Sequence, residues 1–464
     1  MIYTLGIDTN DFEHKEVYEI QNYFRNKSLV QLDTETDGFD KFNNNLTCFQ
    51  LGDFHNQYVI TPDYLHYFQE MLETKTLLMH NAKFDLGFLY KYGIFPNSVF
   101  DTFLAECVLF NGDFTHRKGL GKVAKARLDV DLDKTVRDNI WKEGLTKRVI
   151  EYAAMDVKYL EKIKDSQEIE ILEKKLTKCL KIENNYVLVL AYIEFCGFKL
   201  DKDLWLDKIK HNKEDLDKAR EFLDNYIISN GYSKYIDYQG DLFSDKLKVR
   251  INWDSPLQVI EFFKKLNIPV DIIEKGEEKE SVGAKYIAKY TNDYPIIDPY
   301  LKYKEFQKVV GTYGENFIKQ INKTTGRLHT NYTQIMNTGR ISSGGKNKEN
   351  KTEYINMQNI PADKETRSCF VSEEGNVLVV ADYSGQEQVV LANKSLDPNL
   401  LKFYDDGLSD MHSFTASNMY PELHGMPLDE IKKNHKDKRQ KAKSAGFAIK
   451  IFGNINSLLF FCKN

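Results

Sequence analysis

The chain has 464 residues, which is too many for a single hydrophobic core, so we expect two to four domains. A hydrophobic content of 42% indicates folded interiors, while the apolar runs are too short and interrupted to span a bilayer. The net charge of −5 does not single out a nucleic-acid binder. No secretory signal is visible, and six scattered cysteines without a Cys-x-x-Cys pair favour neither zinc nor disulfides. We therefore expect a cytoplasmic protein with no membrane partner.

The first 164 residues alternate short apolar runs with helical patterns, which predicts an α/β domain. A buried strand at Ser28–Leu32 leads directly into Asp33. Helical spacing of apolar residues predicts a helix over Tyr64–Leu72. Further strands are predicted at Leu46–Leu51, Gln57–Ile60 and Thr76–Met79.

The rest of the chain is mostly helical in pattern. One long helix is predicted within residues 165–200, from apolar residues at Ile169, Leu172, Leu176, Leu180 and Ile182. Residues 201–330 are Lys-rich and helical, with a loop or hairpin at Gly231–Asp245. A solvated loop is predicted at Gly344–Thr352, then a buried strand at Asn376–Ala381, then helices to the end.

Three acidic clusters in the first 164 residues form a candidate catalytic site. Asp33 and Glu35 are two apart on a predicted strand, so their carboxylates share a face. Asp85 follows in His-Asn-Ala-Lys-Phe-Asp, and Tyr152 and Asp156 are four apart on a predicted helix. Oxygen ligands without His or Cys favour Mg²⁺ or Mn²⁺, and two such ions suit phosphodiester hydrolysis, with Tyr152 orienting the attacking water.

Each of these signals is weak alone. An isolated Asp-x-Glu is usually only the end of a strand, and an isolated Tyr-x-x-x-Asp says less. Asn81 and Phe84 have two interpretations each: seating a frayed strand end by stacking, or capping a turn and packing. Three acidic clusters in one order, each beside an apolar run, together favour a site.

A second candidate site lies downstream, at Asp382 after the apolar run Val377–Ala381. An acid at the end of a buried strand can hold a metal in an open cleft. Arg439, Lys443 and Phe447 recur every four residues, so on a helix they present two cations and a ring on one face, which suits a nucleoside triphosphate. The alternative is a solvated basic helix, because Lys432–Lys443 is generally rich in cations.

The first site resembles the DEDD-type 3′→5′ exonucleases of the tyrosine subclass. The resemblance rests on Asp33-Thr-Glu35, His80-Asn-Ala-Lys-Phe-Asp85 and Tyr152-Ala-Ala-Met-Asp156, and on the connecting stretches that begin at Asp101, Lys118 and Leu132. It implies a ribonuclease H-like fold over residues 1–164 and a single-stranded 3′ end as substrate. It also implies that Asp33, Glu35, Asp85 and Asp156 are metal ligands.

The later segments resemble family A DNA polymerases of the polymerase I type, especially phage-like members. The motifs are Thr338-Gly-Arg340, Asn356-Met-Gln-Asn-Ile-Pro361, Asp382-Tyr-Ser-Gly-Gln-Glu387, Asp410-Met-His412 and Arg439-Gln-Lys-Ala-Lys443-Ser-Ala-Gly-Phe447. The resemblance implies a helical thumb with its connecting helix (165–330), a partial α+β palm (331–425) and partial fingers (426–464).

The polymerase resemblance also implies roles for individual residues. Asp382 would be a catalytic metal ligand, and Glu387 would exclude a ribose 2′-hydroxyl. His412, Arg439, Lys443 and Phe447 would hold the incoming dNTP. The primer-template DNA would be contacted by Arg340, Gln358 and Asn359.

Two departures from the family pattern shape the functional hypothesis. Ile451 stands where the family usually has an aromatic residue, and no counterpart of the last palm acid follows the fingers helix before Leu458–Asn464. Two-metal nucleotidyl transfer relies on both palm acids. We therefore expect polymerisation to need a further portion, for example a second polypeptide that buries Phe460 and Phe461; a natural split, an interrupted gene and a truncation are all compatible.

Three functions remain open at this point. The first is a family A DNA polymerase fragment with a proofreading 3′→5′ exonuclease that uses two Mg²⁺ or Mn²⁺ ions per active site. The second is a stand-alone 3′→5′ exonuclease whose remnant polymerase region grips DNA. The third, a non-enzymatic DNA-binding subunit, is disfavoured because clustered carboxylates without a metal cost stability.

Overall fold

The computed structural model describes residues 1–113, 115–132, 144–237, 248–274, 276–346 and 353–452. Its internal contacts divide the chain into two units, residues 1–217 with 305–374, and residues 218–304 with 375–464. Within the described ranges, no helix combines the length and apolar character that crossing a membrane requires.

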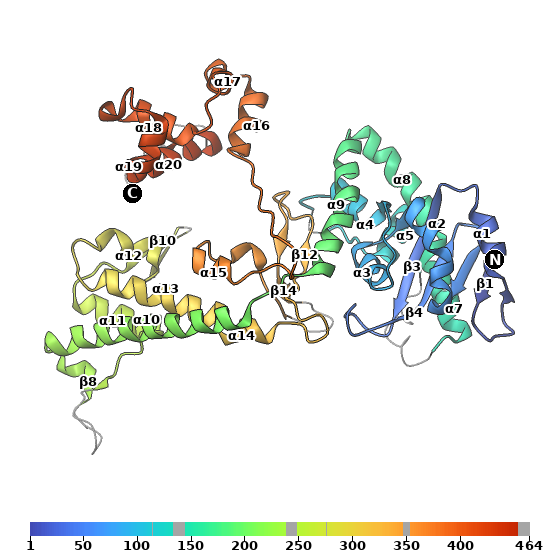
Figure 1. Ribbon diagram of the computed structural model, residues 1–464, viewed down its shortest axis with the longest axis horizontal. Helices are drawn as coiled ribbons and strands as arrows, with labels where there is room; N and C mark the ends of the chain where they lie inside the picture. Colours follow the sequence, from blue (N-terminus) through green and yellow to red (C-terminus); the bar gives the residue numbers. More distant parts are fainter. Residues whose placement is uncertain (114, 133–143, 238–247, 275, 347–352, 453–464) are drawn as a thin grey trace. The chain divides into compact units, whose positions relative to one another are not determined.

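A seven-stranded mixed sheet organises the N-terminal part of the first unit, in the order β2-β1-β5-β4-β3-β6-β7. Its strands β1, β3 and β4 are labelled in Figure 1. Strand β3 is antiparallel to β4 and parallel to β6. The strands are β1 Ile2–Leu5, β2 Glu13–His14, β3 Leu29–Thr36, β4 Leu46–Gly52, β5 Gln57–Ile60, β6 Thr76–Met79 and β7 Ser98–Asp101. The predicted α/β fold is confirmed, and the strands predicted from the sequence agree with β3 to β6 within a few residues.

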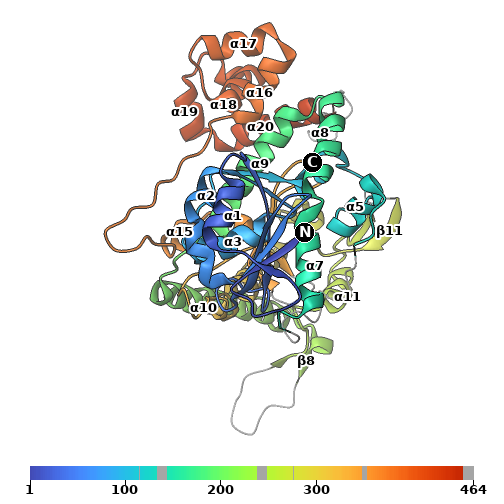
Figure 2. The same cartoon turned by 90° about the vertical axis from the view of Figure 1, so that its right-hand side faces the viewer.

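Helices cover both faces of this sheet (Figure 2). On one face, a core that includes Phe24, Phe68 and Phe88 packs α1, α2 and α3 against the strands. On the other, Ile150, Ala153 and Ala154 of α7 pack on Cys48 and Val59. The helices are α1 Val17–Phe24, the 3₁₀ turn η1 Pro62–Phe68, α2 Gln69–Thr74, α3 Lys83–Lys91, α4 Thr102–Leu109, α5 Leu120–Leu128 and α7 Lys147–Lys158.

The long helix predicted within residues 165–200 is wrong. Two helices occupy this stretch, α8 Leu160–Glu173 and α9 Thr177–Cys196, and Lys175 between them has a positive φ of 58°. Ile169 and Leu172, two of the apolar residues on which the helix was predicted, are 63% and 71% exposed, whereas Ile171 is buried. Packing against the rest of the domain therefore decides which face of α8 is buried. The spacing of apolar residues in the sequence did not reveal that face.

Residues 201–330 are mainly helical, as predicted. The elements are α10 Lys202–Ser229, η3 Ser233–Tyr235, α11 Pro256–Lys265, α12 Ala284–Ile287, η4 Ala288–Tyr290, α13 Ile297–Tyr313 and α14 Glu315–Lys319. Two antiparallel pairs accompany them, β8 Ile236–Asp237 with β9 Lys248–Val249, and β10 Asp271–Glu274 with β11 Glu277–Glu280. Of the loop predicted at Gly231–Asp245, residues 238–245 lie outside the described residues, as do residues 133–137 of the stretch that begins at Leu132.

Short strand pairs follow in the first unit, β12 Tyr332–Thr333 with β13 Ser342–Ser343 and β14 Gly345–Lys346 with β15 Glu353–Tyr354. Residues 347–352 of the loop predicted at Gly344–Thr352 lie outside the described residues. The remaining elements are η5 Met357–Asn359, α15 Lys364–Ser368, α16 Gln386–Ser395, α17 Pro398–Asp405, α18 Met411–Met419, η6 Pro421–Leu423, α19 Leu428–Asn434 and α20 Lys436–Phe452. The helices predicted after residue 381 are confirmed.

The strand predicted at Asn376–Ala381 is wrong. These residues have no strand assignment, and Val377, Val379 and Val380 are 82–87% exposed. A strand is stabilised by hydrogen bonds to a neighbour and by burial of its side chains. In the part of the chain that the structure describes, no strand pairs with this run, so its apolar composition alone does not produce a strand.

Candidate active site

Asp33 and Glu35 project from the same face of β3, a central strand of the sheet. The strand pairs Asp33 with Gln50 and Glu35 with Cys48 of β4, and its register shifts between Glu35 and Thr36, at the end of the strand. The apolar first half of β3 is buried and fixes the register, so the two acids emerge where the strand approaches the surface.

Asp156 reaches the same point from α7. Val149, Ile150, Ala153 and Val157 are fully buried along this helix, which fixes its rotation on the sheet. One carboxylate oxygen each from Asp33, Glu35 and Asp156 lies within 4.8 Å of the others. This geometry brings Asp156 to the neighbouring pair Asp33 and Glu35, from which it is more than a hundred residues away in the sequence.

Tyr152 lies one helical turn before Asp156 and is also buried. Burial and the neighbouring carboxylates of Asp156, Glu35 and Asp33 raise the pKa of its phenol well above the ordinary value. The group is therefore a neutral O–H at physiological pH, suited to donate a hydrogen bond beside the acids.

Asp85 lines the same cavity, from the first turn of α3. Its Oδ1 accepts hydrogen bonds from the Thr34 amide at 3.1 Å and the Thr34 hydroxyl at 2.5 Å, so its position is tied to β3. Burial raises the pKa of Asp85 to about 7, opposed by the hydrogen bonds from Thr34. Asp101, whose pKa burial raises to about 6, caps α4 and also accepts the Asn81 and Ala82 amides, which holds the start of α3 in place.

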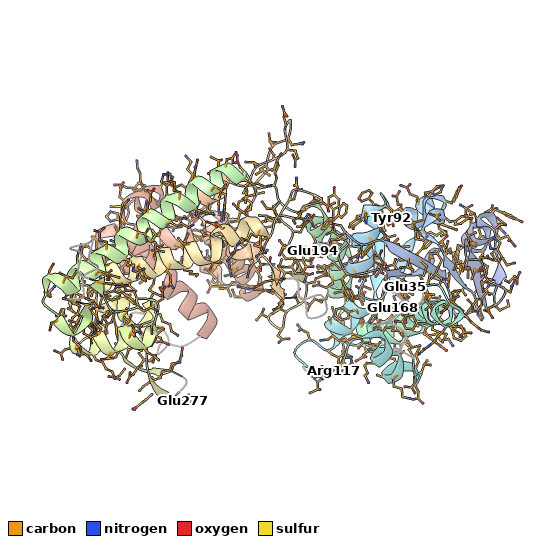
Figure 3. All side chains as sticks on the ribbon, turned by 90° about the horizontal axis from the view of Figure 1, so that it is seen from below. Glu35, Tyr92, Arg117, Glu168, Glu194 and Glu277 are labelled. Carbon is orange, nitrogen blue, oxygen red and sulfur yellow. The ribbon has the colours of Figure 1, made fainter. Side chains whose placement is uncertain are left out.

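A cavity of about 1460 Å³ surrounds the acids. It is open enough for a strand of nucleotides and carries both aromatic and cationic side chains, the combination used for single-stranded nucleic acids. Among its lining residues are Phe39, Asn81, Phe84, Phe88, Phe103, Lys118, Lys122, Lys125 and the segment Asn331–Ile335. Glu35 is labelled within this domain in Figure 3.

The donor set fits a hard divalent cation. All three clustered groups are carboxylates, and carboxylate oxygens are the preferred ligands of Mg²⁺ and Mn²⁺. Cys48 is nearby, but burial and then the charge of Glu35 raise the pKa of its thiol, so it is not a thiolate ligand. Clustered negative charges repel each other without a cation, which favours binding one.

Asp382 lies in a different setting, in the second unit. It follows the exposed run 377–380, and its Oδ1 accepts the amide of the adjacent Tyr383 at 2.9 Å. Among the described residues, the group of three potential metal ligands does not include Asp382. The sequence placed this acid at a strand end; the structure places it in an exposed, non-strand segment.

Arg439 is held by a carboxylate that the site prediction did not include. Its Nε and a terminal nitrogen donate to the two oxygens of Asp410, at 3.1 and 3.0 Å, and Nε also reaches Ser413 Oγ at 3.2 Å. Burial alone would raise the pKa of Asp410, but hydrogen bonds from Arg439 and Ser413 lower it to about 2. The sequence signal was Asp410 three residues before Ser413, the spacing of an N-cap on α18.

A pocket of about 140 Å³ brings Gln388, His412 and Arg439 together. Gln388 and His412 are 3.4 Å apart through Nε2 and Nδ1. Glu387 is exposed at the start of α16, and Lys443 is half-buried on α20. The side chain of Phe447 lies outside the described residues, as do those of Ile451 and residues 453–464, including Phe460 and Phe461.

Arg340, Gln358 and Asn359 belong to the first unit and are exposed. Gln358 accepts the Ser343 amide at 3.0 Å and donates to the Ile341 carbonyl at 3.4 Å, so η5 is tied to the strand that follows Arg340. The backbone carbonyl of Asn359 accepts a hydrogen bond from the Tyr313 hydroxyl. These ties place the two predicted DNA-binding motifs side by side on one surface.

The sequence also missed Lys83, Glu194 and the segment around Tyr332. Lys83 stands within a recognised motif but was given no role, and Glu194 is a buried acid at the end of an apolar helix. The only local signal was Glu194, an acid among apolar residues, which indicates a buried charge with a partner. Its partners, Lys83 and Tyr332, are more than a hundred residues away in the sequence.

Both candidate sites lie in regions of the chain that match known protein families. A family model described as a 3′-5′ exonuclease matches residues 7–172, and one described as DNA polymerase family A matches residues 234–459. The chain contains a region of DNA polymerase family A, residues 234–459. It carries a 3′-5′ exonuclease domain ahead of its polymerase region.

Similar curated proteins are DNA polymerases I. The chain is 28% identical to that of Aquifex aeolicus over 92% of its own length and 69% of the relative's. It is 25% identical to that of Borreliella burgdorferi, over 96% of its own length but only 48% of the relative's. The chain therefore spans about half to two thirds of the length of these relatives.

A solved structure shows the same fold. The polymerase domain of Pol1 from M. smegmatis, in complex with DNA primer-template and dNTP, matches with a TM-score of 0.69 at 19% identity. The match covers 96% of this chain and 71% of that one. At this identity the likeness supports the predicted fold, while the tyrosine subclass and the phage-like character remain predictions.

Proposed function

We propose that this chain removes nucleotides from the 3′ end of a DNA single strand by metal-dependent hydrolysis. The observation that carries the proposal is the convergence of Asp33, Glu35 and Asp156 within 4.8 Å, from a strand and a helix, in a cavity lined by aromatic and cationic side chains. Isolated acids serve many purposes, but three acids within 4.8 Å of one another, beside a cavity of about 1460 Å³, favour phosphodiester chemistry.

Asp33, Glu35 and Asp156 would hold divalent ions, Mg²⁺ or Mn²⁺, with Asp85 as the further ligand from α3. Two such ions activate a water and neutralise charge on the leaving oxygen. Tyr152, as a neutral donor beside Asp156, orients the attacking water. Asn81 and Phe84, which line the cavity, seat the terminal nucleotide.

We further propose that the polymerase region binds primer-template and dNTP in the manner of its family. Asp382 would be a metal ligand there, Glu387 would exclude a ribose 2′-hydroxyl, and Arg340, Gln358 and Asn359 would contact the DNA. His412, Arg439, Lys443 and Phe447 would bind the dNTP, and Arg439 must then exchange Asp410 for a triphosphate or bind with Asp410 still attached.

The boundaries proposed for these functions are residues 1–164 for the exonuclease, 165–330 for the connecting helix and thumb, 331–425 for the partial palm and 426–464 for the partial fingers. We propose that nucleotide addition also requires a palm acid besides Asp382, supplied by a further portion or by a second polypeptide. Asp382 alone offers one carboxylate where two ions need several.

A stand-alone exonuclease with a DNA-gripping polymerase region is the second candidate. Two observations favour it: Asp382 is in an exposed segment outside the three-acid group, and Arg439 is already bound to Asp410. The two candidates share the exonuclease and differ in dNTP incorporation.

A strand labelled at its 5′ end tests the exonuclease activity that both candidates share. With Mg²⁺, the purified chain should give a ladder of products shortened from the 3′ end, and chelation with EDTA should stop the reaction. An intact strand after incubation with Mg²⁺ and with Mn²⁺ would contradict the exonuclease. Extension of a primer after a candidate C-terminal polypeptide is added would favour the polymerase over the stand-alone nuclease.

A further inference from the structure

Lys83 ties the exonuclease helix α3 to a segment far along the chain. Its Nζ lies 2.5 Å from Glu194 Oε1 and donates to Asn331 Oδ1 at 2.9 Å. It also donates to the Tyr332 carbonyl. An ammonium group has three donors, and these three acceptors use all of them, so none remains for a nucleic-acid phosphate.

Glu194 is the other half of this tie. Its side chain is only 4% exposed, and besides Lys83 its Oε1 accepts the Tyr332 amide at 2.6 Å. Lys41 Nζ approaches its second oxygen at 3.6 Å. Glu194 thus binds a cation of α3 and the backbone of β12 with one carboxylate. Figure 3 labels Glu194 on α9, and Figure 1 shows β12 beside that helix.

Two more side chains hold residues 329–335, which we call the tethered segment. His329 Nδ1 lies 2.9 Å from the Glu194 carbonyl, and Gln334 Nε2 donates to the Glu183 carbonyl and carboxylate at 2.8 and 2.7 Å. All the partners belong to the same unit, so the geometry is internal to it. The segment is therefore anchored along its length to α3 and α9.

The tethered segment forms part of the wall of the exonuclease cavity. Asn331 to Ile335 line the same cavity as Asp33, Glu35 and Asp156. They follow Asp156 by more than 170 residues in the sequence. The acids come from the sheet and α7, whereas this wall is held by the Lys83–Glu194 pair together with the contacts of His329 and Gln334. The pair thus helps to set the shape of the cavity from outside the acid cluster.

Building on the proposed exonuclease function, we propose that Lys83 and Glu194 are positioning residues. They hold the tethered segment as a wall that guides the single strand upstream of the nucleotide being removed. Neither residue contacts the reacting atoms. Their loss should weaken the binding of a strand long enough to reach the wall and leave hydrolysis of a minimal substrate unchanged.

Two substrates separate positioning from chemistry. The p-nitrophenyl ester of thymidine 5′-monophosphate needs only the acid cluster, while a labelled oligothymidylate also passes the tethered segment. Glu194→Gln and Lys83→Met should each raise KM for the oligothymidylate about tenfold, which corresponds to about 1.4 kcal/mol of lost binding free energy. Values of kcat and KM for the ester should stay at those of the wild type.

A direct phosphate contact by Lys83 predicts a different pattern. Lys83→Met would then weaken binding, whereas Glu194→Gln, which removes a negative charge near the strand, would leave KM unchanged or lower it. That pattern would overturn the proposal, and so would equal losses on both substrates. If the wild type hydrolyses neither substrate, the proposed function fails instead, and exchange of the Tyr332 amide still tests the tie.

Two control variants separate an effect on the tethered segment from a general loss of protein stability. Lys164→Met removes a Lys–Glu pair of the same type on α8, where Lys164 meets Glu168 at 2.6 Å, and should change neither KM. Because breaking a buried pair can destabilise a fold, Gln334→Ala provides a variant that leaves no buried charge unpaired, and it should show the same rise restricted to the oligothymidylate. Hydrogen exchange at the Tyr332 amide should accelerate in Glu194→Gln; protection equal to that of the wild type would contradict the tie.

Discussion

Asp33 and Glu35 act against the stability of the apo protein, because their negative charges are held together with that of Asp156. The double change Asp33→Ala and Glu35→Ala should lower the rate of 3′-end degradation by about 10³-fold, the size seen when a principal electrostatic group is removed. The melting temperature without metal should stay the same or rise. Product ladders and thermal melts measure the two effects, and residual degradation near the wild-type rate would contradict the role of these acids.

Tyr152 gives a narrower prediction. Tyr152→Phe removes only the hydroxyl beside Asp156, so the rate of hydrolysis should fall about 10²-fold, at the low end of what a positioned proton donor contributes. KM for the strand should not change, because the ring still packs in the same place. Steady-state kinetics on the labelled oligothymidylate measure both; an unchanged kcat would remove Tyr152 from the mechanism.

For individual residues, the sequence was enough to predict which acids lie together in the site. It did not predict the contact between Lys83 and Glu194. The period of two along a strand was enough to place Asp33 and Glu35 on one face, and helical spacing was enough to put Tyr152 beside Asp156. The Lys83–Glu194 pair joins residues more than a hundred positions apart, and no local spacing encodes such a contact.

The turn between β4 and β5 depends on one aspartate. Asp53 accepts the His55 and Asn56 amides at 2.8 and 2.9 Å, and its other oxygen receives Tyr23 Oη at 2.6 Å and Lys27 Nζ at 2.5 Å. Burial opposes ionisation of Asp53, but the hydrogen bonds from Lys27, Tyr23 and the amides prevail and lower its pKa to about 2. The side chain thus connects α1 to the sheet.

This depressed pKa sets the direction of a pH effect. The ionised form is favoured in the folded state, so its stabilisation is present above the ordinary aspartate pKa and is lost as the pH falls toward 2. Asp53→Asn should lower the free energy of unfolding near neutral pH by about 1–2 kcal/mol, with a smaller difference from wild type as the pH falls from about 4 to 2. Urea denaturation across this range measures it; a difference that grows toward acid pH would contradict the assignment.

Among the elements, short strands were predicted better than long helices. β4, β5 and β6 agree with prediction because polar or turn residues bound each apolar run. The break between α8 and α9 falls at Lys174–Leu176, which contains neither Gly nor Pro, so no local signal marked it. The run 376–381 has strand composition but no partner among the described strands, and pairing is what makes a strand.

On the scale of the whole molecule, the acid cluster should couple metal binding to stability. Saturating Mn²⁺ should raise the melting temperature of the exonuclease transition by about 5 °C, because a ligand that binds only the folded state stabilises it. The double variant Asp33→Ala with Glu35→Ala should show no rise. Differential scanning fluorimetry measures both, and an equal rise in the two proteins would place the binding elsewhere.

The polymerase region gives the remaining prediction. The chain alone should not extend a primer, because Asp382 lies outside any cluster of three potential metal ligands in the described ranges. A polypeptide that supplies a second palm acid should restore dNTP incorporation. A primer-extension gel with and without that polypeptide measures this, and extension by the chain alone would contradict the need for the further acid.

The family A assignment rests on motifs spread along the whole chain, but the central physical claim is local: carboxylates from β3 and α7 form a divalent-metal site. Crystals soaked in Mn²⁺ and measured at the manganese absorption edge test it most directly. An anomalous peak among the oxygens of Asp33, Glu35 and Asp156, lost in the double alanine variant, is the predicted result. Carboxylates that point apart, with no peak between them, would contradict it.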